Sequence, residues 1–278
     1  VLKKFQVGIT VQEALDAKEG QIVNGCLILK GQRYYKEQFK EKHFSSVLAL
    51  NLAGVPDSMF KCAQNLINVI MPKVVVVNAG SFSLTKLQNC YFPKLVRIGD
   101  FAFSWCKIQQ LNSHSFPALT TVGIEGFCNC QYINSVNLPS LLTVGDGGFA
   151  RCKSLKYLSA PKLQKIGSNL VSWCPQLMGI DCKLVPEWFR CRTGDQNMGC
   201  GECSVCAGKL SEFLKKGQVM NQSWTKLDQT QKDQPPLFGF LVEHFRNNLN
   251  LLKQIGRCDA EQQQLRRKLE DDLEFGGE

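Results

Sequence analysis

The sequence has little of the material from which enzymes and membrane-spanning proteins are built. It contains 3 histidines in 278 residues, and it lacks the glycine-rich phosphate-binding pattern, His-Glu-x-x-His and Gly-x-Ser-x-Gly. No stretch reaches the roughly 18 apolar residues that a transmembrane helix needs. Residues 58–189 carry only 5 acidic residues against 12 basic ones, so a pair of acids for general acid–base chemistry has few candidates. These absences predict a protein that is not an enzyme and has no transmembrane segment.

Clustered arginines interleaved with aromatic residues, which are typical of nucleic-acid-binding proteins, are also missing. The net charge is +9, and most of the excess lies on residues 58–189, whereas residues 190–278 carry 13 basic and 13 acidic residues. Such an excess can attract an acidic partner, but solvated lysines on loops explain it more simply. We therefore expect no nucleic-acid partner.

The sequence does contain a segment that returns with small changes along half of the chain. One position of the repeat recurs at steps of 21 to 24 residues, at Cys62, Thr85, Cys106, Cys130, Cys152 and Cys174. The consensus around it is Phe-x-x-Cys-x-x-Leu-x-x-Leu-x-Leu-Pro-x-Leu-x-x-Ile-Gly, and its spacing to proline slips in the Cys106 copy. A period of about 20–29 residues predicts a solenoid, in which stacked rungs share one core.

Each part of the consensus predicts a local structure. Leu-x-x-Leu-x-Leu predicts a short strand that adds to a parallel sheet on one face, and proline suits the end of such a strand. The glycine of Ile-Gly predicts a tight turn with positive φ, a conformation that glycine adopts without steric cost. Cysteine at the repeated position packs as a small buried apolar residue.

The repeated segments resemble the BspA-like class of leucine-rich repeats over roughly residues 46–189. The resemblance implies an α/β fold, namely a leucine-rich repeat solenoid with a parallel sheet on one face. It also implies a binding protein, since family members are mostly binding proteins and several are surface or adhesive proteins of microbes. The predicted organisation is an N-terminal cap (1–45), the solenoid (46–189), a cysteine-rich segment (190–206) and a helical C-terminal region (207–278).

The N-terminal segment has the composition of a cap, which the open end of a solenoid requires. Residues 11–18 predict a short helix that begins after Thr10, and Asn24-Gly25 predicts a two-residue hairpin turn. Residues 33–43 are charged and compatible with a second helix. At the other end of the chain, apolar residues at spacings of three and four from Leu237 onward predict helices.

Strand alternation predicts which side chains of the repeat face outward. The predicted binding strip is polar and nearly uncharged, and it consists of Tyr91, Gln110, Asn112, Ser135, Asn137, Tyr157 and Ser159. With strands about 4.8 Å apart, six rungs give only about 240 Å², whereas a standard interface buries about 800 Å² on each partner. A protein partner must therefore also contact loops or the end regions.

Cysteines beyond the repeats allow three interpretations. Cys191, Cys200, Cys203 and Cys206 either hold a structural zinc ion, or form disulfides that cap the solenoid, or stay as free thiols. The spacing does not select among them, because the two Cys-x-x-Cys pairs share Cys203. No other cofactor is expected.

The most direct functional hypothesis is a non-enzymatic protein–protein interaction module that uses the sheet face and flanking loops. One alternative is a cell-surface adhesion protein of the same fold. Another is the recognition subunit of a zinc-containing assembly of the ubiquitin-ligase type. A row of buried free thiols favours a reducing compartment and thus a cytoplasmic location, while disulfides at residues 182–206 would favour a secreted or surface protein.

Overall fold

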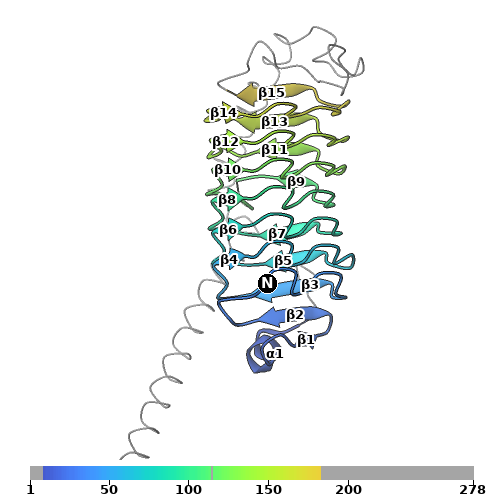
Figure 1. Ribbon diagram of the computed structural model, residues 1–278, viewed down its shortest axis with the longest axis vertical. Helices are drawn as coiled ribbons and strands as arrows, with labels where there is room; N and C mark the ends of the chain where they lie inside the picture. Colours follow the sequence, from blue (N-terminus) through green and yellow to red (C-terminus); the bar gives the residue numbers. More distant parts are fainter. Residues whose placement is uncertain (1–8, 114, 183–278) are drawn as a thin grey trace, which may run out of the picture. The chain divides into compact units, whose positions relative to one another are not determined.

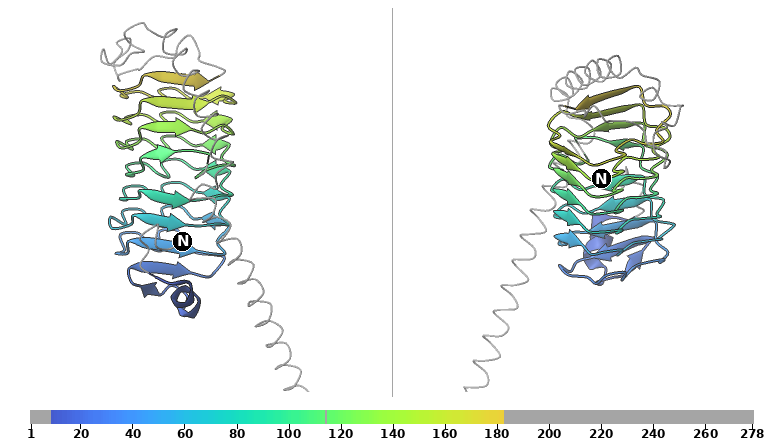
Figure 2. Two further views of the ribbon diagram at one scale, coloured as in Figure 1. Left: turned by 180° about the vertical axis from the view of Figure 1, so that it is seen from behind. Right: turned by 45° about the horizontal axis from the view of Figure 1, so that its top comes forward.

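The computed structural model describes residues 9–113 and 115–182, which form a stack of similar coils (Figure 1). The elements in chain order are α1 (Val11–Asp16), β1 (Ile22–Val23), β2 (Cys26–Leu29), β3 (Ser46–Ala49), β4 (Gly54–Val55), β5 (Asn68–Ile70), β6 (Val76–Val77), β7 (Asn89–Tyr91), β8 (Arg97–Ile98), β9 (Gln110–Leu111), β10 (Thr121–Val122), β11 (Ser135–Asn137), β12 (Thr143–Val144), β13 (Tyr157–Ala160), β14 (Lys165–Ile166) and β15 (Gly179–Cys182). Figure 2 shows the strands crossing the long axis of the stack. The predicted solenoid with a parallel sheet on one face is confirmed.

The predicted strands form this face in two sheets, ordered β1-β2-β3-β5-β7 and β9-β11-β13-β15. All pairs except β1 with β2 are parallel, and equivalent residues of successive copies lie side by side, as Val136 does with Leu111 and Leu158. These middle residues are buried, because alternate side chains of a strand point to opposite faces.

The face divides between β7 and β9, at the copy whose spacing to proline slips. Leu111 is followed by a turn in which the backbone N–H of Ser115 donates to Asn112 Oδ1 (3.0 Å) and that of Phe116 to the Asn112 carbonyl oxygen (3.1 Å). β9 therefore ends after two residues. Phe116 still reaches the core, so the longer copy preserves the buried side and alters the exposed one.

A second parallel sheet, ordered β14-β12-β10-β8-β6-β4, runs up another side of the stack. Four of its two-residue strands, β8, β10, β12 and β14, end just before the glycine that follows in the repeat, and that glycine does not have the predicted positive φ. A Cβ at Gly145 would lie 2.6 Å from the Ile124 nitrogen, and one at Gly167 would lie 2.3 Å from the Asp146 nitrogen. Glycine is needed here because the backbone of the preceding coil approaches too closely for a side chain.

The third side of each coil is a run of turns, which we call the turn ribbon. Every fourth ribbon residue has positive φ, at 37 and 41, 58 and 62, 80 and 84, 101 and 105, 125 and 129, 147 and 151, and 169 and 173. Alternate N–H groups donate to the next coil, as Phe101, Phe103 and Trp105 do to the carbonyl oxygens of Ile124, Gly126 and Cys128. The consensus did not indicate this ladder, since only Gly80 and Gly147 among these residues are glycine.

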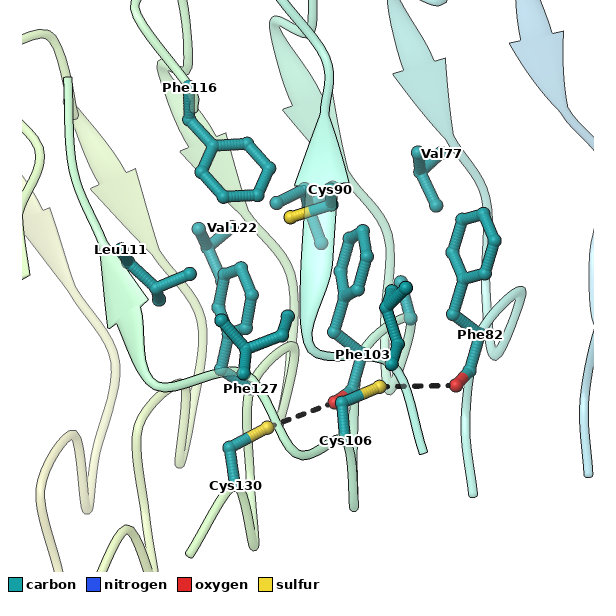
Figure 3. Packing of buried hydrophobic residues seen from close by; sticks show 14 of the residues in the cluster. Val77, Phe82, Cys90, Phe103, Cys106, Leu111, Phe116, Val122, Phe127 and Cys130 are labelled. Atoms are coloured by element: carbon teal, nitrogen blue, oxygen red, sulfur yellow. Dashed lines mark hydrogen bonds between the residues drawn. The ribbon is translucent and has the colours of Figure 1, made fainter. Parts of the chain in front are cut away.

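The three sides enclose a continuous core. The middle residue of each ribbon segment except the last is a phenylalanine, which is partly buried at Phe39 and fully buried in the later segments. These rings stack along the axis: the centroids of Phe127 and Phe149 are 5.6 Å apart, and those of Phe103 and Phe127 are 5.3 Å apart (Figure 3). The repeated cysteines lie beside this column. The Cys106 thiol donates to the Phe82 carbonyl oxygen at 3.2 Å, and the Cys130 thiol to that of Phe103 at 3.0 Å.

The N-terminal end has the predicted helix and hairpin. Thr10 caps α1, and Thr10 and Glu13 form a reciprocal capping box. Asn24 and Gly25, both with positive φ, join β1 and β2. The second helix at residues 33–43 is wrong: Phe39 enters the phenylalanine column and residues 37–41 are the first segment of the turn ribbon. β2 also pairs with β3 in parallel, so the stack begins before residue 46.

The predicted cysteine-rich segment and helical C-terminal region lie outside the described residues, as do Cys191, Cys200, Cys203 and Cys206. In the described part of the chain, no helix combines the length and apolarity that a membrane crossing requires.

Candidate functional site

The predicted strip lies on the outward face of β7, β9, β11 and β13 and the turn after β9. Gln110 is exposed, and the strip residues that are half-buried are Tyr91, Asn112, Ser135, Asn137 and Tyr157. Ser159 is only 1% exposed. Five of the seven residues are register neighbours, in which Gln110, Ser135 and Tyr157 make one row and Asn137 and Ser159 make the next, although the buried Ser159 adds no exposed surface.

The strip is shorter than the sequence predicts. Tyr91 belongs to the other sheet, where it lies beside Ile70, and Asn112 turns away from the strand ladder. Asn68, Ile70 and Gly179, which alternation also predicts to be exposed, are buried. The break at residues 112–116 accounts for the division into two patches.

Hydrogen bonds hold several strip side chains in fixed positions. The Ser135 hydroxyl donates to Asn134 Oδ1 (3.0 Å), and the Ser159 hydroxyl donates to Asp181 Oδ2 (3.1 Å). The Tyr157 hydroxyl points to Met178 Sδ at 3.7 Å. Side chains that are already ordered lose less entropy when a partner binds.

The other patch contains a polar ladder that the sequence did not indicate. Asn68 Nδ2 donates to Ser46 Oγ at 3.2 Å, and Asn89 Nδ2 donates to Asn68 Oδ1 at 2.9 Å. The three residues are register neighbours on β3, β5 and β7. The only available signal was the recurrence of a short polar residue at one strand position. The ladder satisfies buried polar groups and fixes the register of these strands.

Most of the described cysteines are buried. All nine are free thiols. Burial raises the pKa of the Cys26, Cys106 and Cys182 thiols to about 12 and that of Cys130 well above its usual range, so these thiols stay protonated at neutral pH and are poor nucleophiles and metal ligands. Within residues 9–113 and 115–182, no three His, Cys, Asp or Glu side chains are grouped so as to hold a metal ion.

Solved structures with a similar arrangement are bacterial leucine-rich repeat proteins. A leucine-rich repeat protein from Bacteroides ovatus is 16% identical over 50% of this chain and 55% of that chain, with a TM-score of 0.28. One from Eubacterium ventriosum is 14% identical over 66% and 69% of the two chains, with a TM-score of 0.31. A leucine rich cell surface protein from Faecalibacterium prausnitzii is 16% identical over 56% and 64%, with a TM-score of 0.23. The chain thus spans little more than half the length of the first of these proteins.

No curated protein matches the sequence. The comparisons give no support to a zinc-containing ligase assembly or to a cytoplasmic location. The model of the BspA type leucine rich repeat region matches six copies at residues 48–182, which are the coils from β3 to β15. Residues 48–182 are therefore a BspA-type leucine-rich repeat region.

Proposed function

We propose that the chain is a non-enzymatic protein-interaction module and that the patch of Gln110, Ser135, Asn137 and Tyr157 is part of its binding surface. The observation that supports this most directly is the register of β9, β11 and β13, which sets polar side chains and one tyrosine in adjacent rows on a fully packed scaffold. Tyrosine offers a large amphipathic contact area at low entropic cost.

The small area of the patch adds a condition. Three strands separated by two spacings of about 4.8 Å offer an area far below the roughly 800 Å² of a standard interface. The proposed partner therefore also contacts the loops that flank the strands, including the turn at Asn112 that the longer copy adds beside the patch.

The test is differential capture from an extract of the source organism. The Tyr157→Arg, Asn137→Arg double variant places two cations on the patch, while Lys165→Glu on β14 changes an exposed charge on the second sheet and is the matched control. We expect a protein that the unmodified chain and the control retain and the double variant releases. Equal capture by all three chains, with unchanged unfolding curves, would exclude this patch.

A location at the cell surface is the second candidate, because the BspA-type resemblance implies surface proteins among its members. Labelling intact source cells with a membrane-impermeant amine reagent tests it, since exposed lysines such as Lys94 and Lys165 would be modified only on a surface protein. Labelling that requires lysed cells would assign the chain to the interior.

A further inference from the structure

A groove of about 630 Å³ lies along the turn ribbon, away from the outward strand positions just described. Trp105, Asn129, Arg151 and Trp173 occupy the same left-handed position in four successive ribbon segments and line it. Gln131, Lys153 and Pro175, each two residues after such a position, complete the lining. The two tryptophans are 49% and 44% exposed, so large aromatic surfaces stand at both ends of a row of polar side chains.

The backbone under the groove is already paired. The N–H groups of Trp105, Asn129 and Arg151 donate to carbonyl oxygens of the next coil at 2.9, 2.9 and 2.7 Å. An extended peptide therefore finds no free strand edge here, and recognition by strand addition is excluded. A ligand must bind through side chains alone.

The polar side chains of the groove are mainly hydrogen-bond donors. Arg151 and Lys153 offer only N–H groups, and no carboxylate belongs to the lining. Among residues 9–113 and 115–182, the one ion pair within 4.0 Å is Lys40 with Glu37, so no described carboxylate lies within ion-pair distance of either groove cation. The groove thus complements a ligand with many acceptors, some negative charge and few N–H donors of its own.

We propose that the groove binds an acidic, proline-rich segment of a protein in the polyproline II conformation. Proline has no N–H, and the polyproline II backbone makes no internal hydrogen bonds, so its carbonyl oxygens are free to accept from Arg151, Lys153 and Gln131. Aromatic side chains form the grooves that receive such segments elsewhere. Four ribbon segments span about 14 Å, which is the length of about five residues in this conformation.

A neutral glycan fits the groove less well. Each sugar hydroxyl brings a donor that requires an acceptor, and the lining offers mainly the amide oxygens of Asn129 and Gln131. An acidic polysaccharide shares the negative charge of the proposed segment, so it is included in the test as a competitor.

The experiment is selection of a random peptide display library on the full chain, with titration of the enriched peptides at low and high salt. We expect enrichment of proline together with aspartate or glutamate. Trp105→Ala should weaken the selected peptides about tenfold, as loss of an aromatic anchor does. Arg151→Gln should weaken them about threefold at low salt and flatten the salt dependence.

Phe101→Ala is the matched control, because Phe101 is a 44% exposed aromatic at the other left-handed position of the same ribbon segment and does not line the groove. Its affinity should equal that of the unmodified chain. If Trp105→Ala alters the unfolding curve, Trp105→Phe and the Arg151→Gln, Lys153→Gln pair give the same comparison.

Two results overturn the proposal. One is a selection without proline and acidic enrichment, or with peptides that bind Trp105→Ala equally well. The other is binding of polygalacturonate that Trp105→Ala abolishes while no peptide is enriched, which would assign the groove to acidic glycans. Neither outcome bears on the strand patch, whose variants lie on β11 and β13.

Discussion

The strands and the turn ribbon both hydrogen-bond to the neighbouring coil, but they do so with different backbone conformations. Strand residues alternate inward and outward with negative φ, and their side chains can be assigned from the sequence pattern. Ribbon segments place every fourth residue in the left-handed region, at side chains as different as Leu84, Phe101 and Arg151. The comparison shows that inter-coil hydrogen bonds can hold a backbone in a conformation that the residue types alone do not favour.

Both sides depend on the core column between them, so its disruption should have the largest effect. Phe127 is fully buried and stacks on Phe103 and Phe149. Phe127→Ala should lower the free energy of unfolding by about 3–5 kcal/mol, measured by urea denaturation. Tyr132→Ala, at a residue that is 51% exposed, is the control and should cost less than about 1 kcal/mol. Similar losses for the two variants would contradict a shared column.

The second sheet should be sensitive where coils approach most closely. A Cβ at Gly145 would meet backbone atoms at 2.6 and 2.8 Å, whereas at Gly54 the nearest atom would be the Val76 oxygen at 3.6 Å. Gly145→Ala should therefore destabilise the chain by about 2–3 kcal/mol and Gly54→Ala by less than about 1 kcal/mol. Thermal unfolding of the two variants measures the difference, and equal melting temperatures would show that the coils can separate without cost.

Alkaline pH should lower the free energy of unfolding through the buried cysteines of the repeat. Burial raises the pKa of Cys106 to about 12, above the value of about 8.5 of an unfolded cysteine. The folded chain thus keeps a proton that the unfolded chain loses, so this contribution is complete below about pH 8.5 and falls as the pH rises toward about 12, by about 1.4 kcal/mol for each pH unit. Urea unfolding measured between pH 7.5 and 10 should show a smaller fall in the free energy of unfolding for Cys106→Val than for the unmodified chain.

Substitution by glycine should raise the stability of the chain in the turn ribbon and lower it in a strand. Glu41 is an exposed ribbon residue with a φ of 59°, and Arg97 is an exposed residue of β8. Glu41→Gly should stabilise the chain by up to about 1 kcal/mol because it relieves a left-handed backbone. Arg97→Gly should destabilise it by about 0.5–1 kcal/mol. Loss of stability in both variants would mean that the ribbon conformation carries no strain.

The sequence was sufficient for the parts of the fold that repeat. The inward positions of Val136 and Phe127 are apolar in every copy, so their pattern predicts the strands, the core and the family. The ribbon was missed because its left-handed residues vary in type, and the role of Gly145 was misjudged because close approach involves a different coil. The strip was only partly predicted, since its division depends on how the longer copy at Asn112 folds.

The turn ribbon also gives the stack a net dipole along its axis. Its inter-coil N–H groups, such as those of Phe103 and Phe127, all point toward the coil of higher residue number. Peptide dipoles aligned in this way add along the axis, as they do in a helix, whereas the alternating groups of the strands largely cancel. The ribbon segment at 169–173 is therefore the positive pole and the segment at 37–41 the negative pole. The two ends of the solenoid therefore present electrostatic potentials of opposite sign to any molecule that binds there.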